Sequence, residues 1–384
     1  MKKEYLMTPG PTPVPTDVLL AQARCMIHHR TPLFTETLLS LIGDLKYIFQ
    51  TKNDVLIFAS SGTGAMESAV VNLFSPGDKV IAASNGKFGD RFIKLAEVYG
   101  LNVAKLEYEW NKVVNPDDIA NLLEKDKNIK GILVVQSETS TGILNDIKTI
   151  GEIVEDHPAV LVVDSITGIG AVECKTDEWH LDVVMTGSQK GLMLPPGLAC
   201  VSVSDKAWEA VERSTLPKFY FSYKKYRDAL GRSSPQTPFT PPISLMMALR
   251  EALRLIREEG LENVIRRHAI LAEAVRQGVQ ALGLELFAPP GGRGNAVTPV
   301  KVPQGIDGTK IVKIMRDKYG ITIAGGQEHL KGKIFRIGHL GYFDRFDIIT
   351  TLSGLESTLS ELGYPLEFGT AIKAAEEVFR ENPL

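Results

Sequence analysis

The chain has 384 residues, of which 44% are hydrophobic and 23% are charged, and its formal net charge at pH 7 is −3. These values are typical of a soluble globular enzyme of two or three domains. They give no electrostatic reason to expect nucleic acid or an acidic membrane as a partner. No apolar run approaches the ~18 to 20 residues of a membrane span, and the start of the chain lacks the apolar core of a signal peptide. Three scattered cysteines suit a reducing compartment, so we expect a cytoplasmic protein.

The first predicted feature along the chain is an extended arm. Residues 9–15 are too rich in proline for a helix or a central strand. From about residue 55 to 205, apolar strand-like runs alternate with helical stretches. The predicted strands are 55–58, 79–83, 102–106, 131–135, 160–163, 183–186 and 199–203, with helices at 64–74 and 88–99. Near-continuous apolar strands separated by helices predict an α/β fold with a mostly parallel sheet covered on both faces.

The second half of the chain has a different character. Residues 219–242 are rich in Tyr, Ser, Pro and Thr and are predicted to be irregular, whereas 243–259 and 261–282 have the apolar spacing of helices. The remainder predicts a smaller α+β unit, with strands near 284–287, 297–302, 321–324 and 334–337 and helices at 309–319, 344–362 and 371–380. We therefore expect an N-terminal arm at 1–15, a large domain at 16–258 and a small C-terminal domain at 259–384.

Two polar side chains follow the ends of neighbouring predicted strands. Asp164 directly follows the strand at 160–163, and Lys190 comes shortly after the strand at 183–186. Ligands of open α/β sheets bind in the crevice outside the carboxyl ends of the strands. A lysine that forms a Schiff base and a carboxylate that pairs with the pyridinium nitrogen are the two groups that pyridoxal 5′-phosphate (PLP) needs from a protein. The pair therefore predicts a PLP site, although each residue alone also fits an ordinary turn aspartate or surface lysine.

Two further turns lie at predicted strand ends. Ser61-Gly62-Thr63-Gly64 opens directly into a helix, where free backbone N–H groups and the positive helix end can bind phosphate. It is not a Walker loop, since no Gly-Lys-Ser/Thr follows, and the Gly-x-Gly-x-x-Gly dinucleotide pattern is absent. Residues 136–142 form a hydroxyl-rich turn that either bonds a phenolate oxygen or caps the next helix.

These motifs carry a resemblance to a known family, the class V PLP-dependent aminotransferases. The motifs are Ser61-Gly62-Thr63-Gly64, Asn85-Gly86-Lys87-Phe88-Gly89, Glu138-Thr139-Ser140-Thr141-Gly142, Val163-Asp164-Ser165, and Gly187-Ser188-Gln189-Lys190 with Pro195-Pro196-Gly197. Within the family, the chain is most similar to the alanine–glyoxylate and serine–pyruvate (serine–glyoxylate) aminotransferases. The resemblance extends from Pro9 to Gly341 and implies the PLP-dependent transferase fold type I.

The resemblance implies roles for individual residues. Lys190 would hold PLP and act as the acid–base catalyst, and Asp164 would pair with the pyridine nitrogen. Phe88 would stack on the cofactor ring, and Thr139 would approach the phenolic oxygen. The full set of implied cofactor-binding residues is Thr63, Gly64, Ala65, Phe88, Thr139, Asp164, Gln189, Lys190, Thr237 and Thr240.

A partner subunit would supply Thr237 and Thr240, so the resemblance implies a homodimer with shared active sites. Arg336 would bind the substrate carboxylate with its planar charged fork, unless it forms an interior salt bridge. Gly10 would contact the substrate. The seven histidines show no metal-ligand spacing, so we expect no metal site.

The implied reaction moves an amino group between a small 2-amino acid, alanine or serine, and a 2-oxo acid, glyoxylate or pyruvate, in a ping-pong cycle. An alternative is a preference for 2-aminoethylphosphonate, or for aspartate with the cluster His28-His29-Arg30 facing its side-chain carboxylate. Another alternative is a non-catalytic subunit of a complex, in which loss of the lysine or the aspartate would be expected. A cysteine desulfurase is disfavoured, because no cysteine follows Cys200.

Overall fold

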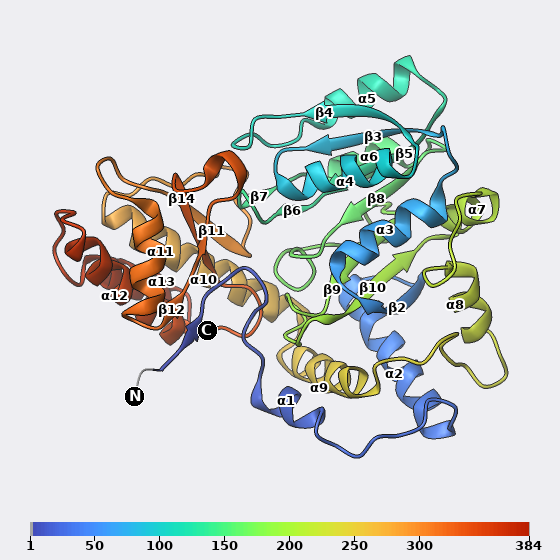
Figure 1. The fold of residues 1–384 in the computed structure, drawn as a ribbon, viewed down its shortest axis with the longest axis horizontal. Helices are drawn as coiled ribbons and strands as arrows, with labels where there is room; N and C mark the ends of the chain where they lie inside the picture. The colour runs from blue at the N-terminus through green and yellow to red at the C-terminus, as the bar shows by residue number, and fades with distance from the viewer. Residues whose placement is uncertain (1–2, 384) are drawn as a thin grey trace.

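A seven-stranded sheet forms the centre of the larger part of the molecule (Figure 1). In the computed structural model, which describes residues 3–383, the strand order is β2-β10-β9-β8-β5-β3-β4. The strands are β2 (Asp54–Ser60), β3 (Lys79–Ser84), β4 (Asn102–Glu107), β5 (Ile129–Val135), β8 (Val160–Asp164), β9 (Val183–Gly187) and β10 (Gly197–Val203). Neighbours are parallel except at β10, which runs antiparallel to both β2 and β9. The prediction of a mostly parallel sheet is confirmed, and so is each strand predicted for this region.

Helices cover the sheet on both faces, because successive strand residues point to opposite sides. In β2, Val55 and Ile57 belong to one apolar core, whereas Leu56 and Phe58 belong to the other. The first core is closed by α2 (Pro32–Phe49), α5 (Pro116–Lys125), α6 (Ile147–Val154) and α9 (Ile243–Glu259). The second is closed by α3 (Gly62–Leu73), α4 (Lys87–Val98), α7 (Asp205–Arg213) and α8 (Tyr223–Leu230). Since α3 and α4 begin just after β2 and β3 end, their N-termini lie at the sheet edge where the strands end.

Helix α8 corrects the prediction that residues 219–242 are wholly irregular. Its Tyr223 and Tyr226 are buried, and their ring centroids lie 5.8 and 4.4 Å from that of Phe58 on β2. Residues three apart share one face of a helix, so this pair forms the buried face of α8. The prediction was wrong there because the tyrosines were interpreted as loop composition rather than as a core-facing pair.

The C-terminal part is a smaller α+β unit, drawn from gold to red in Figure 1. Its antiparallel sheet has the order β11-β14-β13, with β11 (Val297–Lys301), β13 (Ala324–Gly325) and β14 (Ile334–Gly338). A third apolar core joins this sheet to α10 (Leu261–Ala281), α11 (Gly308–Asp317), α12 (Arg345–Glu361) and α13 (Thr370–Glu381). The strand predicted at 284–287 is reduced to one bridge between Leu286 and Val300. The domain limits 1–15, 16–258 and 259–384 stay a prediction.

The N-terminal segment joins the two parts. Strand β1 (Tyr5–Leu6) pairs in parallel with β12 (Ile321–Thr322), and Met7 lies in the third core. Residues 9–15 form neither helix nor strand, as their prolines predict, and lead into α1 (Thr16–Ala21). Figure 1 shows this dark blue segment passing between the C-terminal part and the large sheet. Within the described residues, no helix combines the length and the apolar character needed to cross a membrane.

Candidate active site

Asp164 and Lys190 lie at the ends of adjacent parallel strands. Asp164 is the last residue of β8, and Lys190 lies in the connection between β9 and β10. Both side chains are buried, with 3% of Asp164 and 9% of Lys190 exposed. Burial of two ionisable groups costs free energy unless they are compensated, so their placement indicates a functional site.

The Lys190 amine is enclosed by the N-terminal segment. Its Nζ donates a hydrogen bond to the carbonyl oxygen of Pro9 at 2.7 Å. Gly10 follows with φ of +132°, and a Cβ atom at that position would lie only 2.1 Å from Lys190 Nζ. Burial lowers the pKa of Lys190 to about 8, and the charges of Arg336 and Arg91 act in the same direction. Asp164 opposes this shift.

The Asp164 carboxyl group has the opposite shift. Burial raises its pKa to about 7, and the charge of Glu138 adds to this rise. The Ile166 amide, which donates to Asp164 Oδ1 at 2.8 Å, and the charges of Arg91 and Lys190 act against it. Each member of the lysine–aspartate pair therefore favours the charged form of the other.

The start of α3 has the properties of a phosphate-binding turn. Its N-cap residue, Ser61, makes no side-chain cap, and the Ala65 amide already donates to Ser61 O at 3.1 Å. Gly64 and Ala65 are both predicted cofactor-binding residues. Of their two backbone amides, that of Gly64 has no acceptor among the described residues. Gln189 lies alongside, and its buried Oε1 has no hydrogen-bond partner in the described part of the chain. Thr63 Oγ1 accepts from Arg91 Nη1 at 2.9 Å.

Arg336, on β14, approaches the same site from the C-terminal part. It is 6% exposed, and it donates from Nε to Gly325 O and from Nη1 to Thr139 O, both at 2.9 Å. No carboxylate of the described residues forms an ion pair with it. Burial lowers the pKa of Arg336 to about 10, against the charge of Glu138. The alternative of an interior salt bridge is therefore wrong for this chain.

Two residues of the site were given no role from the sequence. Arg91 lies one turn after Phe88 on α4, with its guanidinium carbon 4.7 Å from the centre of the Phe88 ring, and its charge acts on both Asp164 and Lys190. Glu138 is fully buried in the hairpin of β6 (Ser137–Glu138) and β7 (Ile143–Leu144). For Arg91 the available signal was its i, i+3 spacing from Phe88. Glu138 stood in the hydroxyl-rich turn at 136–142, with no signal of its own in the sequence.

Thr237 and Thr240 are the predicted residues that this chain does not bring to Lys190. Thr237 is buried and donates from Oγ1 to Phe239 O at 2.7 Å, whereas Thr240 is exposed. Arg30 fixes the same loop, since its Nη1 donates to Gln236 Oε1 at 2.5 Å and to Thr237 O at 2.8 Å. Within one chain, Phe239 of this loop packs against Tyr226 and the second apolar core, over β2.

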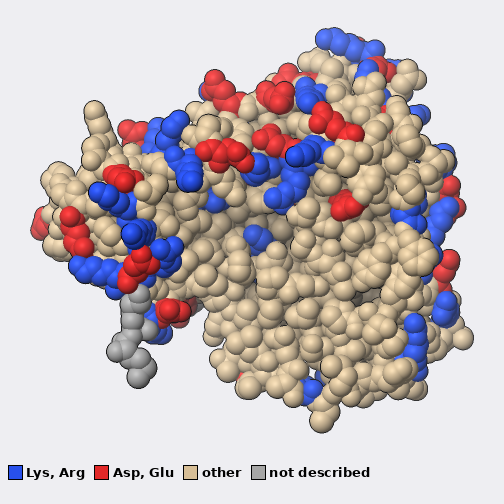
Figure 2. Space-filling view, in the orientation of Figure 1, with Lys and Arg blue, Asp and Glu red and all other residues tan. Residues whose placement is uncertain are grey.

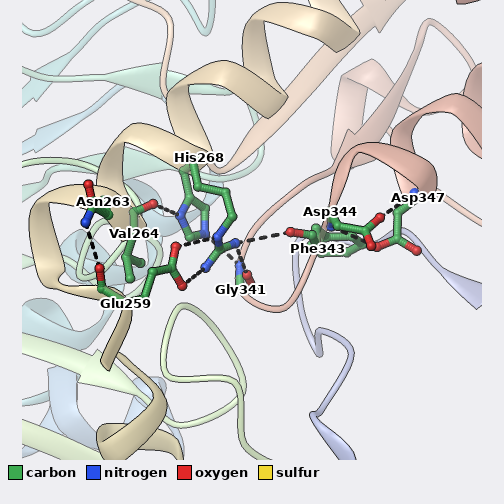
Figure 3. A network of polar contacts seen from close by, with 9 residues as sticks. Glu259, Asn263, Val264, His268, Gly341, Phe343, Asp344 and Asp347 are labelled. Atoms are coloured by element: carbon green, nitrogen blue, oxygen red, sulfur yellow. Dashed lines mark hydrogen bonds and ion pairs between the residues drawn. The ribbon is translucent and has the colours of Figure 1, made fainter. Parts of the chain in front are cut away.

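A polar network holds the loop that follows β14 (Figure 3). Arg267 of α10 binds both carboxylate oxygens of Glu259, at 2.7 and 3.0 Å, and donates to the carbonyl oxygens of Gly341 and Phe343. His268 accepts from the Gly341 amide at 2.8 Å. Gly341 adopts φ of +95°, and a Cβ atom there would lie 3.0 Å from Lys190 O. The network therefore connects the end of α9 and the start of α10 to the backbone of Lys190.

Comparisons with known proteins agree with this arrangement. The family model for aminotransferase class-V matches residues 5–339. A Synechococcus protein named as the small subunit of a soluble hydrogenase is 46% identical over 98% of each chain. The serine–glyoxylate aminotransferase of Methylorubrum extorquens is 38% identical over 100% of this chain and 97% of its own length. The crystal structure of ureidoglycine–glyoxylate aminotransferase from Bacillus subtilis covers 99% of each chain at 32% identity, with a TM-score of 0.95.

The motifs, the fold and these matches lead to the same assignment. Most of the chain fits the family model, and a solved structure of the family superposes over nearly its whole length. The fold type I architecture implied by the motifs is confirmed, and the chain belongs to the class-V aminotransferase family.

Proposed function

We propose that this aminotransferase uses PLP to move an amino group between alanine or serine and a small 2-oxo acid, glyoxylate or pyruvate. The names of two similar proteins support glyoxylate as an acceptor, since one acts on serine and glyoxylate and the other on ureidoglycine and glyoxylate. The single observation that carries the proposal is the convergence of a buried lysine–aspartate pair and a buried arginine that has no carboxylate ion pair among residues 3–383.

The fit of these residues to PLP is tested by groups that lack partners. The orphaned Gln189 Oε1 and the open amide of Gly64 lie beside the start of α3, where a phosphate would be stabilised by the helix dipole. The residues that would hold the cofactor are Thr63, Gly64, Ala65, Phe88, Thr139, Asp164, Gln189 and Lys190. When bound, PLP supplies an electron sink for the charge that develops on the substrate α-carbon.

Lys190 is suited to move the α-proton. Because its pKa is lowered to about 8, a substantial fraction of the amine is neutral at physiological pH and can act as a base. The contact with Pro9 O fixes the direction of the side chain. Burial raises the pKa of Asp164 to about 7, and the charge of Lys190 acts against this rise and favours the ionised form that would pair with a pyridinium nitrogen.

Arg336 would bind the α-carboxylate of the substrate. A buried guanidinium without a counter-ion is costly, and its pKa is lowered to about 10 because burial disfavours the charge. A carboxylate ligand would neutralise the buried guanidinium charge and could accept two parallel hydrogen bonds from it. The side chain is already oriented by Gly325 O and Thr139 O, so little entropy is lost on binding.

A homodimer would explain the loop that carries Thr237 and Thr240. Figure 2 shows few charged side chains on the lower surface, over α1 and α9 in Figure 1. Exposed large apolar side chains of this region include Leu19, Leu20, Met26, Leu33 and Leu39. Contiguous apolar surface marks an interaction site, and a second copy placed there could bring the two threonines to the neighbouring phosphate turn.

The cluster His28-His29-Arg30 gives little support to aspartate as the donor. An aspartate donor needs a second cation, and Arg30 is already bonded to Gln236 and Thr237. A role as a non-catalytic subunit is disfavoured because the lysine and the aspartate are both present and both buried. Burial of ionisable groups costs free energy, which a catalytic role would explain.

Absorbance spectroscopy of the purified protein with PLP tests the function. L-alanine, L-serine and L-aspartate are added separately, followed by glyoxylate or pyruvate. We expect a visible cofactor band that alanine or serine depletes and an oxo acid restores. The Lys190→Ala variant can hold PLP only non-covalently, and it should not turn over. Protein that remains colourless after incubation with PLP would refute the proposal.

Substitution of Arg336 tests the carboxylate site. Arg336→Gln should raise the KM for the amino donor by a factor of about 10 to 100, because a charge-assisted hydrogen bond contributes roughly 1.5–3 kcal/mol. Steady-state kinetics with alanine and serine measure the change, and PLP titration serves as the control. Unchanged KM values for both substrates would place the carboxylate site elsewhere.

A further inference from the structure

Four hydrogen-bond donors converge on the carboxylate of Glu138, which is completely buried. Oε2 accepts from the backbone amides of Phe88 at 2.9 Å and Gly89 at 3.1 Å. Oε1 accepts from the amide of Ser140 at 3.0 Å and from its hydroxyl at 2.5 Å. Glu138 therefore bonds two segments that lie about fifty residues apart in the sequence.

The first of these segments is the N-terminus of α4. The N-cap residue is Gly86, which has no side chain to accept the amides that begin a helix. Glu138 accepts two of these amides, and Ser140 Oγ accepts a third, from Lys87 at 2.9 Å. A carboxylate at this position also interacts favourably with the helix dipole. The cap of α4 is thus supplied by the β6–β7 hairpin.

The contact is close enough to exclude other residues at position 86. A Cβ atom on Gly86 would lie 2.4 Å from both Cγ and Cδ of Glu138 and 2.6 Å from Ser140 Oγ. The hairpin and the start of α4 are therefore in direct contact at Gly86, which has no side chain. Hydrogen bonds fix their relative position.

The same hairpin contacts the proposed substrate site. Thr139, next to Glu138, accepts Arg336 Nη1 at its carbonyl oxygen, and its hydroxyl bonds Thr167 Oγ1 at 2.9 Å. Phe88 and Arg91 lie in the first turns of α4. Glu138 is thus the link between Phe88, on one element, and Arg336, on another.

We propose that Glu138 is a positioning residue, which holds Phe88 against the cofactor and sets its distance from the substrate-binding Arg336. The proposal rests on the proposed function, because it assigns Phe88 and Arg336 to cofactor and substrate. Burial raises the pKa of Glu138, and the hydrogen bonds from Ser140, Gly89 and Phe88 act against that rise. The three backbone amides among the donors can only donate, which is the pattern that a carboxylate accepts.

Glutamine cannot reproduce this arrangement. Glu138→Gln keeps the size of the side chain, but its NH₂ group must face donors at one of the two oxygen positions. The Phe88 and Gly89 amides, or the Ser140 pair, would then be left without an acceptor. The start of α4 should shift and carry the Phe88 ring with it.

Glu356 offers a matched control far along the chain. It is also buried, at 1% exposure, and it accepts the amides of Gly369 and Ala371, both at 2.8 Å, at the start of α13. Glu356→Gln therefore removes a remote carboxylate cap of the same type, with no bond to Phe88 or Arg336. A general loss of stability should be common to both variants.

The experiment compares wild type, Glu138→Gln, Glu356→Gln and the milder Ser140→Ala. Thermal unfolding of cofactor-free protein reports stability, PLP titration reports affinity, and the visible circular dichroism of bound PLP reports the asymmetry of its surroundings. For Glu138→Gln we expect a weaker PLP affinity and a higher donor KM, each by about tenfold, the factor expected when one charge-assisted hydrogen bond is lost. The dichroism band should change, and Ser140→Ala should change in the same direction by less.

The results separate the possible failures. If Glu138→Gln and Glu356→Gln lose stability alike and keep the wild-type PLP affinity, dichroism and KM, Glu138 is only a structural cap and the proposal is overturned. If Glu138→Gln does not fold, the smaller change expected in Ser140→Ala decides, and its absence overturns the proposal. Failure of the wild-type protein to bind PLP would instead refute the proposed function.

Discussion

At the residue scale, the site holds two ionisable groups whose pKa values are shifted toward each other. The Asp164 pKa is raised to about 7 and the Lys190 pKa is lowered to about 8, in both cases first by burial. In unfolded chains, these side chains titrate near ~3.9 and ~10.4. The folded state therefore binds Asp164's proton more strongly than the unfolded state does and Lys190's proton more weakly.

The sign of the resulting pH dependence follows from linkage. The contribution of Asp164 to stability is fully present below about pH 4 and is lost as the pH rises to about 7. The contribution of Lys190 is present above about pH 10.4 and is lost as the pH falls to about 8. In cofactor-free protein, the free energy of unfolding should fall between pH 4 and 7, by at most about 1.4 kcal/mol per pH unit, because of Asp164. Asp164→Asn should remove this slope. Urea unfolding of both proteins between pH 4 and 7 measures this, and identical slopes would contradict it.

Gly10 should tolerate no side chain. In Gly10→Ala, the new methyl group would lie 2.1 Å from Lys190 Nζ, so the amine must move and turnover should fall by about 100-fold or more, as expected for a misplacement of about 1 Å. Gly291→Ala is the control, because Gly291 also has a positive φ, of +80°, but has no atom within 4 Å of the added carbon. Equal activity of the two variants would contradict a role for the Gly10 contact.

The site residues that the sequence predicts most directly are those that follow a general rule of sheets. Asp164 and Lys190 were predicted because strand ends carry ligand sites, and that geometry needs no knowledge of distant contacts. Glu138 and Arg91 could not be found in this way. Glu138 acts on Phe88 from a separate hairpin, and Arg91 belongs to the site only because α4 turns it toward Thr63.

At the element scale, α10 supports the loop between β14 and α12. Arg267 forms a two-point bond with Glu259 and holds two carbonyl groups of that loop. Arg267→Lys keeps the charge and loses the planar fork. It should lower the free energy of unfolding by about 1.5–3 kcal/mol and reduce kcat, since Gly341 packs on the Lys190 backbone.

Arg254 provides the control for that substitution. It also contacts two glutamates, Glu251 and Glu258, but on the exposed face of α9. Arg254→Lys should leave the free energy of unfolding almost unchanged, because exposed ion pairs contribute little. Chemical denaturation and steady-state kinetics on both variants give the comparison, and equal effects would show that the buried network has no special role.

The direction of one strand could have been predicted and was not. Residues 188–196, between β9 and β10, are fewer than the dozen or so that a parallel crossover needs, so β10 had to be antiparallel. The prediction that residues 219–242 are irregular was wrong for a different reason. Its composition resembles a loop, and only contact with Phe58 shows that Tyr223 and Tyr226 are core residues.

At the scale of the whole molecule, the weakly charged face over α1 and α9 is the proposed dimer surface. Leu20→Glu places a charge on α1, where Leu20 is 61% exposed in the single chain, and should weaken dimerisation by at least tenfold, because a buried charge must be desolvated. Val98→Glu, at a residue 71% exposed on α4, should have no effect. Sedimentation at several concentrations measures the association, and a Leu20→Glu variant that associates like wild type would contradict this surface.

The pairing of β1 with β12 also orders the events of synthesis. Pro9 and Gly10, which enclose the Lys190 amine, leave the ribosome well before the residues that anchor their segment. Those anchoring residues are Ile321 and Thr322 on β12 and Gly338 on β14. Domains fold as their residues emerge, so the large sheet can assemble while its N-terminal wall still lacks a partner. The pocket around Lys190 is therefore completed only after β12 and β14 have been made.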